Sequence, residues 1–141
     1  MSVTSEASAS WKGSLFEGSG EVALASSGQG PFAVDWKARS EGSTSVTTPE
    51  ELIAAAHASC YCMALSNALA ENGTAPENIE TTAPVTFIPG TGITGSHLNV
   101  NAVVPGISAA DFARIADAAK TGCPVSQALA SIDITLKATL A

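Results

Sequence analysis

Apolar and polar residues alternate in several short segments, a period of two that is typical of half-buried β-strands. Near the N-terminus, residues 11–12 and 21–24 flank the turn-forming segment EGSGE. This arrangement predicts a hairpin with Leu15 and Phe16 buried. Alternation over residues 32–36 predicts a third strand with one apolar face.

The second half of the chain shows the same alternation. Residues 79–88 and 97–104 predict two strands joined by the turn-rich segment PGTGITGS. Residues 132–140 alternate strictly and predict a final, half-exposed strand.

Between these groups of strands, the segment TPEELIAAAHASCYCMALSNAL predicts one long helix, preceded by the polar loop SEGSTSVTT. Thr48 is expected to cap its N-terminus, Pro49 suits the first helical position, and Glu51 closes a capping box. The helix should end near Glu71, because Gly73 follows as a stop signal.

Two shorter helices are predicted before the last strand. Ser108 and Asp111 start the first, which Gly122 ends, and Cys123-Pro124 opens the second, PVSQALA. This order of elements indicates an α+β protein rather than repeated βαβ units. A chain of 141 residues is the size of one domain, so we expect a single domain over residues 1–141.

The long helix is apolar on nearly all sides, since no charged residue occurs between Leu52 and Leu69. Such a helix should be covered on nearly all sides. One small sheet covers one face only, so the other face is expected to meet the same helix of a second subunit. The pattern therefore predicts an intimate homodimer.

Charge and composition exclude several classes of partner. Thirteen acidic and six scattered basic residues give a net charge of -7, which argues against binding to nucleic acid or an anionic membrane. No eighteen consecutive residues are apolar, so a soluble, intracellular protein is expected. Three cysteines do not form the dense, even pattern of a secreted disulfide scaffold and are expected to be reduced thiols.

The cysteines differ in what their positions favour. Cys60, in the middle of the long helix, suits packing as well as reaction. Cys62 lies about 200° further around the helix, so the two cannot share a face, and it is interpreted as structural. Cys123 precedes Pro124 and is predicted to be an N-cap or N′ residue, where unpaired N–H groups favour a thiolate.

A thiolate at Cys60 would need a positive charge nearby. Arg39 is the candidate, because it comes just before the polar loop that leads into the helix. The only other arginine, Arg114, is expected on the solvent face of the second predicted helix.

The segment PEELIAAAHASC, followed some sixty residues later by GCPVSQAL, closely resembles the OsmC/Ohr family of thiol-dependent peroxidases. The resemblance extends from about Trp11 to the final strand. It implies an OsmC-like fold, with antiparallel sheets around a long buried central helix, in an interlocked homodimer.

The resemblance also implies roles for four residues. Cys60 corresponds to the peroxidatic cysteine and Cys123 to its disulfide partner, while Arg39 and Glu50 resemble the ion pair beside the reactive thiolate. The position of Arg39 shortly before PEEL matches the OsmC branch. Cys62 departs from the family pattern.

The implied activity is the reduction of organic hydroperoxides, and less well of hydrogen peroxide, to alcohols. Cys60 becomes a sulfenic acid, Cys123 closes a disulfide, and an external dithiol reduces it. The resemblance implies no metal and no organic cofactor, and places the protein in cytoplasmic defence against oxidative or osmotic stress.

Helix geometry adds one inference about Glu50. It is ten residues before Cys60, which separates them by about 15 Å along a straight helix. A glutamate side chain cannot span that distance. If Glu50 serves the site at Cys60, it comes most simply from the second subunit, with the two long helices antiparallel.

Three other interpretations stay open at this point. His57 shares a helix face with Cys60, as in a Cys–His hydrolase, but mid-helix N–H groups provide no oxyanion donors. His57, Cys60, Cys123 and His97 would be the ligands of a metal site, without the tight spacing of such sites. The same cysteine pair would also suit a dimeric redox-sensing or small-ligand-binding module without turnover.

Overall fold

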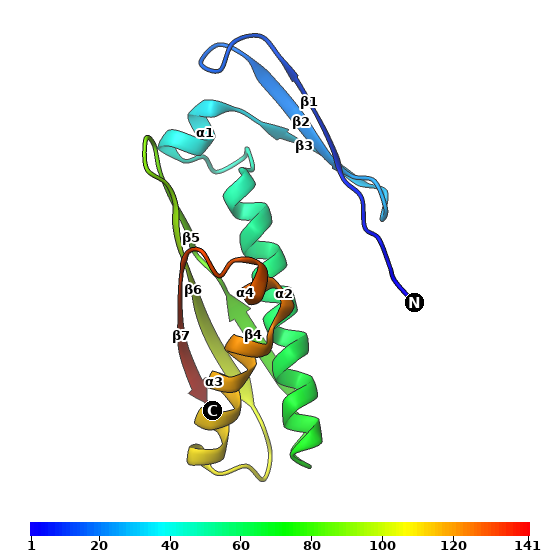
Figure 1. Ribbon diagram of the computed structural model, residues 1–141, viewed down its shortest axis with the longest axis vertical. Coiled ribbons are helices and arrows are strands. Elements are labelled where there is room, and N and C mark those ends of the chain that lie inside the picture. Colours follow the sequence, from blue (N-terminus) through cyan, green and yellow to red (C-terminus); the bar gives the residue numbers. More distant parts are fainter. The chain divides into compact units, whose positions relative to one another are not determined.

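The computed structural model describes residues 1–141, which form two compact units, residues 1–50 and 51–141 (Figure 1). The first unit contains the strands β1 (Ser8–Lys12), β2 (Ser19–Leu24) and β3 (Gln29–Val34) and the helix α1 (Trp36–Glu41). The three strands pair antiparallel in the order β1-β2-β3. The predicted hairpin and third strand are therefore confirmed.

Two predictions about the first unit are wrong. Leu15 and Phe16 are 50% and 77% exposed rather than buried, because they lie in the turn between β1 and β2 and not on a strand. Trp36 does not end the third strand but begins α1. The cause is Asp35, whose Oδ1 accepts a hydrogen bond from the Ala38 N–H at 2.7 Å and caps a helix that was not predicted.

The long predicted helix is α2 (Pro49–Glu71), which begins at the end of the first unit and continues into the second. The remaining elements are β4 (Asn78–Thr82), β5 (Val85–Ile88), β6 (Gly92–Val103), α3 (Ala109–Gly122), α4 (Pro124–Ala128) and β7 (Asp133–Leu140). This order confirms the α+β class. Both short helices begin and end close to the predicted positions, and the Ser108 hydroxyl accepts from the Asp111 N–H at 3.1 Å.

The sheet of the second unit is built around β6. β4 pairs with residues 99–103 of β6 and β5 with residues 92–96, so the predicted strand 79–88 is in fact two strands, interrupted at Ala83-Pro84. Most of the segment predicted as a turn belongs to β6 itself. The sheet is also mixed rather than antiparallel, because β7 returns parallel to β6 after the crossover through α3 and α4.

The core of the second unit lies on one face of this sheet. Inward residues alternate along β6, and α2 and α3 cover them (Figure 1). The buried side chains include Leu98, Val100 and Ala102 of β6, Tyr61, Leu65 and Leu69 of α2, and Phe112, Ile115 and Ala119 of α3.

By length and composition alone, α2 would be able to cross a membrane. In the part of α2 that belongs to the second unit, however, the buried residues recur every four positions, at His57, Tyr61, Leu65 and Leu69, and form the face that packs in the core. The side chain of Met63, on another face, is 69% exposed. Within this chain α2 is thus a core helix that is covered on one side only.

Candidate active site

The two cysteines that were predicted to act together lie side by side in the second unit. Cys60 is half-buried on α2, and Cys123 is completely buried at the start of α4. Their Sγ atoms are 2.9 Å apart and both thiols are free. Since a disulfide bond is about 2.05 Å long, the pair is reduced but needs little movement to bond.

Local structure explains the position of Cys123. It is the N-cap residue of α4, as predicted, with Pro124 at the first helical position. Its own N–H donates to the Ala119 carbonyl at 2.9 Å, which ties it to the last turn of α3. The backbone of Cys123 is therefore held between the last turn of α3 and the first turn of α4.

The surroundings of the two thiols favour a thiolate at Cys123. Burial raises the pKa of Cys123, but the contact with Cys60 and the polar groups of Ser126 and Val125 at the start of α4 leave that pKa below its ordinary value. Burial raises the pKa of Cys60, and the hydrogen bond to Cys123 raises it further, against a smaller opposite effect of the Val125 N–H. A thiolate at Cys60 thus needs a positive charge from elsewhere.

Cys62 faces away from this pair. Its Sγ donates to Thr81 Oγ1 of β4 at 3.1 Å. This contact agrees with the interpretation of Cys62 as a structural residue that lies on a different face of the helix from Cys60.

Arg39 and Glu50 form an ion pair in the first unit. Arg39 Nε lies 3.0 and 3.3 Å from the two Glu50 carboxylate oxygens, and Nη2 lies 2.8 Å from Oε1. The Glu50 side chain is 7% exposed and that of Arg39 is 33% exposed. Two guanidinium nitrogens on one buried carboxylate hold the arginine in a fixed orientation.

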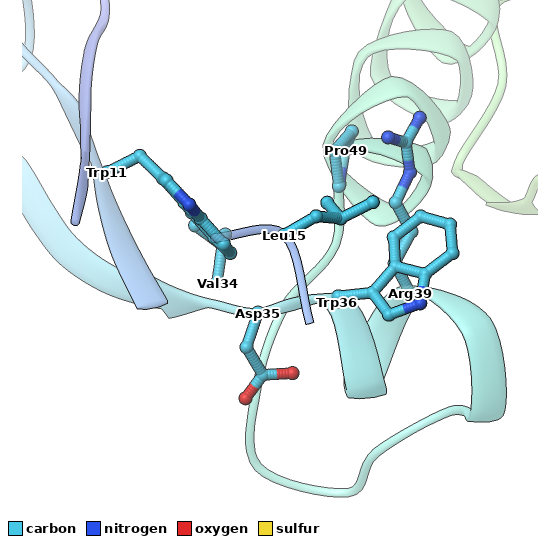
Figure 2. Close-up of a pocket in the computed structure, with 7 residues that line it drawn as sticks. All are labelled: Trp11, Leu15, Val34, Asp35, Trp36, Arg39 and Pro49. Carbon is cyan, nitrogen blue, oxygen red and sulfur yellow. The ribbon is translucent and has the colours of Figure 1, made fainter. Parts of the chain in front are cut away.

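A cavity of about 380 Å³ lies beside this arginine, in the same unit (Figure 2). Its lining is mostly apolar, and the guanidinium of Arg39 points toward Pro49 (Figure 2). The lining residues are Trp11, Leu15, Val34, Asp35, Trp36, Arg39 and Pro49. Leu15, although exposed, therefore contributes to a cavity wall.

The four predicted site residues thus form two pairs, one in each unit. Arg39 is joined to Glu50 within residues 1–50, and Cys60 to Cys123 within residues 51–141. The other arginine, Arg114, is exposed and paired with Asp111 at 3.3 Å, as its predicted solvent position implies.

His57 takes part in a network that the sequence did not indicate. Its Nδ1 lies 2.6 Å from Ser96 Oγ of β6, and its Nε2 lies 2.8 Å from Ser126 Oγ of α4. Each ring nitrogen is therefore bonded to a serine, unlike the His–Cys60 pair of the hydrolase interpretation. The sequence did not indicate Ser96, because the segment that contains it was predicted as a turn and not as part of a strand.

No group of three or more His, Cys, Asp or Glu side chains is arranged to hold a metal ion. His97, one of the ligands considered, bonds through Nδ1 to Thr135 Oγ1 at 2.7 Å.

Comparison with known proteins places these observations in a family. The sequence profile described as "OsmC-like protein" matches residues 42–137. The chain belongs to the OsmC-like family. Peroxiredoxin OsmC of Escherichia coli (strain K12) is 42% identical over 139 residues, which cover 96% of both chains.

Solved structures show the same OsmC-like fold. An OsmC-like protein of unknown function from Vibrio cholerae superposes with a TM-score of 0.74 over 98% of this chain and 100% of its own, at 14% identity. The organic hydroperoxide resistance protein OsmC of Legionella pneumophila gives a TM-score of 0.70 over 97% of both chains, at 22% identity. The predicted family and the predicted α+β, OsmC-like fold with a long central helix are confirmed.

Proposed function

We propose that this OsmC-like protein is a cysteine-based peroxidase that reduces organic hydroperoxides to alcohols, and hydrogen peroxide less well. The observation that carries the proposal is the contact of two free thiols, 2.9 Å apart, in a chain that is 42% identical to a peroxiredoxin. We place the activity in the cytoplasm, in defence against oxidative or osmotic stress.

The reaction needs only the two thiols and an external reductant. The Cys60 thiolate attacks the peroxide oxygen, the O–O bond breaks, and the alkoxide leaves as an alcohol after taking a proton. Cys123 then attacks the sulfenic acid of Cys60, forming the S–S bond and releasing water. An external dithiol opens the disulfide and becomes oxidised itself.

Arg39 supplies the charge that Cys60 lacks within its own unit. Its guanidinium stabilises the Cys60 thiolate and donates hydrogen bonds to the peroxide, while Glu50 holds it in orientation. Glu50 and Cys60 are ten residues apart in α2, about 15 Å along the helix. Arg39 and Glu50 of one subunit therefore serve Cys60 of the other.

Two features support the interlocked homodimer that this requires. No residue of β1, β2 or β3 is buried, and Trp11 and Phe32 of this sheet are 42% and 40% exposed. The exposed residues of α2 include Met63. Large apolar side chains of this kind are normally covered. A second copy of the chain covers both the sheet and the exposed face of α2. Light scattering should give twice the mass of the chain; a monomer at working concentration would contradict the dimer.

The cavity beside Arg39 supports an organic substrate. Its indole and aliphatic walls suit the hydrocarbon part of a hydroperoxide, while the guanidinium at its edge suits the peroxide oxygens. Hydrogen peroxide gains nothing from these walls, so we expect it to react more slowly.

The test is steady-state peroxide consumption with an added dithiol, using cumene hydroperoxide, tert-butyl hydroperoxide and hydrogen peroxide. The proposal requires sustained turnover that is faster with the organic peroxides. Oxidation of one equivalent without turnover would instead indicate a redox sensor. The variant Cys60→Ser should be inactive, and Cys123→Ser should react once.

A further inference from the structure

Two side-chain contacts join α2 to the start of α4, one helical turn apart. Cys60 Sγ lies 2.9 Å from Cys123 Sγ, and His57 Nε2 lies 2.8 Å from Ser126 Oγ. The two contacts are three positions apart along each segment, in opposite directions, so the two segments run antiparallel with these residues facing each other. Residues three positions apart on a helix are neighbours on its surface. The polar contact therefore lies beside the contact of the two sulfur atoms.

The hydrogen bonds of His57 hold its ring in one orientation. On the side away from Ser126, Nδ1 lies 2.6 Å from Ser96 Oγ of β6. Since both ring nitrogens are bonded, the ring cannot turn without losing a hydrogen bond. His57 and Ser96 are completely buried and Ser126 is 6% exposed, so a lost bond leaves a polar group unpaired away from water, which is costly. The ring is thus a rigid connection from the sheet to α4.

The helix α4 has little else to hold it in place. It is five residues long, which is too short for a stable helix on its own, and the Cys123 side chain gives its N-terminus no capping hydrogen bond. Ser126 is the one buried residue of α4; Val125 is partly buried, and Pro124, Gln127 and Ala128 are exposed. Besides the backbone connection to α3, the contact of Ser126 with His57 is therefore what fixes α4 against the core.

We propose that His57 is a positioning residue for disulfide closure: through its hydrogen bond to Ser126 it holds α4 so that Cys123 stays in contact with Cys60. This inference rests on the peroxidase function proposed above. His57 itself does not touch the reacting atoms and transfers no proton in this role. It acts on the position of the helix that carries Cys123.

The closing step shows what this positioning contributes. Cys123 Sγ attacks Sγ of the Cys60 sulfenic acid, so that the S–S bond forms, the S–O bond breaks, and the thiol proton and the hydroxide leave as water. The sulfur atoms, 2.9 Å apart, need only approach to about 2.05 Å, a movement small enough for the contact of His57 with Ser126 to persist. Without that contact, α4 also takes up positions in which the sulfurs are apart. The rate and the equilibrium of closure then fall with the fraction of molecules in which they meet.

Four variants separate this role from general stabilisation. Ser126→Ala and His57→Leu remove the hydrogen bond. His57→Gln is the conservative variant, because its amide can reach the position of Nε2 and bond to the Ser126 hydroxyl. Gln127→Ala is the matched control in the same helix: its side chain is exposed and donates to the Thr121 carbonyl at 3.4 Å, a bond that water can replace.

The first measurement needs no peroxide. Each variant is equilibrated with mixtures of reduced and oxidised dithiothreitol, and peptide mass spectrometry gives the fraction with the disulfide between Cys60 and Cys123. The equilibrium constant for disulfide formation should fall about 10-fold in Ser126→Ala and His57→Leu, the upper end of what one buried hydrogen bond contributes. It should stay within about threefold of the wild type in His57→Gln and within about twofold in Gln127→Ala.

A merely structural role of His57 would lower Tm and leave this constant unchanged. A lower Tm with the wild-type constant in Ser126→Ala and His57→Leu would therefore overturn the proposal. A decrease in His57→Gln or in Gln127→Ala as large as that in Ser126→Ala would overturn it too.

The second measurement follows one turnover. The reduced protein is mixed with one equivalent of cumene hydroperoxide, and samples are quenched with a 1,3-dione that traps sulfenic acid. Disulfide closure should slow about 10-fold relative to sulfenic acid formation in Ser126→Ala and His57→Leu, and closure at the wild-type rate in both would overturn the positioning role. A wild type that forms no sulfenic acid would overturn the proposed peroxidase function, and the equilibrium with dithiothreitol would then decide the role of His57.

Discussion

The role of Arg39 as an oriented guanidinium, rather than as a charge alone, is tested by Arg39→Lys. The lysine keeps the positive charge but presents one nitrogen in place of a planar fork. In the structure, Arg39 places Nε and Nη2 on the Glu50 carboxylate in three contacts of 2.8 to 3.3 Å. A single ammonium can retain at best one or two of these contacts.

The expected effect follows from the lost contacts. Hydrogen bonds to charged groups contribute about 1.5 to 3 kcal/mol each, and the 33% exposure of Arg39 places this pair near the low end. A loss of about 1.5 to 3 kcal/mol in orienting energy corresponds to about a 10- to 10²-fold decrease in rate. The decrease should affect sulfenic acid formation, the step in which the guanidinium faces the peroxide.

The assay is stopped-flow measurement of sulfenic acid formation at pH 7 with tert-butyl hydroperoxide. Arg114→Lys is the matched control, because Arg114 is exposed and pairs only with Asp111 at the surface. The control should react like the wild type. An Arg39→Lys rate within about twofold of the wild type would refute the orienting role.

Three further predictions follow from single contacts. Tyr61→Phe removes the buried hydrogen bond to the Ala116 carbonyl, 2.9 Å long, and should lower the free energy of unfolding by about 1 kcal/mol and Tm by about 3 °C; an unchanged Tm in calorimetry would contradict this. Burial lowers the pKa of His57 in the folded chain. As the pH falls below about 6.5, the imidazole ring is therefore protonated in the unfolded chain before it is protonated in the folded chain, which favours unfolding. Tm should therefore decrease from pH 7 to 5.5, and less steeply in His57→Gln; equal slopes would contradict the assignment. Cys62→Ser keeps a hydroxyl opposite Thr81 and should leave turnover unchanged, whereas a large loss would give Cys62 a redox role.

Local signals predicted the helices of the second unit well. Pro49 and the apolar run after it define α2, and the Ser108 cap defines the start of α3. Such caps and stops act within a few residues, so they can be read from the sequence. The same holds for Cys123, whose N-cap position depends only on Pro124 behind it.

Long-range pairing was harder to predict. β6 begins at Gly92, inside a segment rich in turn residues, because β5 and β7 pair with it there and override local preference. The same error concealed Ser96, and with it the network of His57. The contact of Cys60 with Cys123 also depends on folding across 63 positions, and only the family resemblance suggested it.

The most direct test of the account is to locate the sulfenic acid. Within residues 51–141 the thiolate is favoured at Cys123, so the assignment of Cys60 as the peroxidatic residue depends on Arg39. One equivalent of cumene hydroperoxide is added to Cys60→Ser and to Cys123→Ser, and the trapped adduct is mapped by peptide mass spectrometry. The account predicts an adduct on Cys60 in Cys123→Ser and almost none in Cys60→Ser; rapid formation on Cys123 in Cys60→Ser would contradict it.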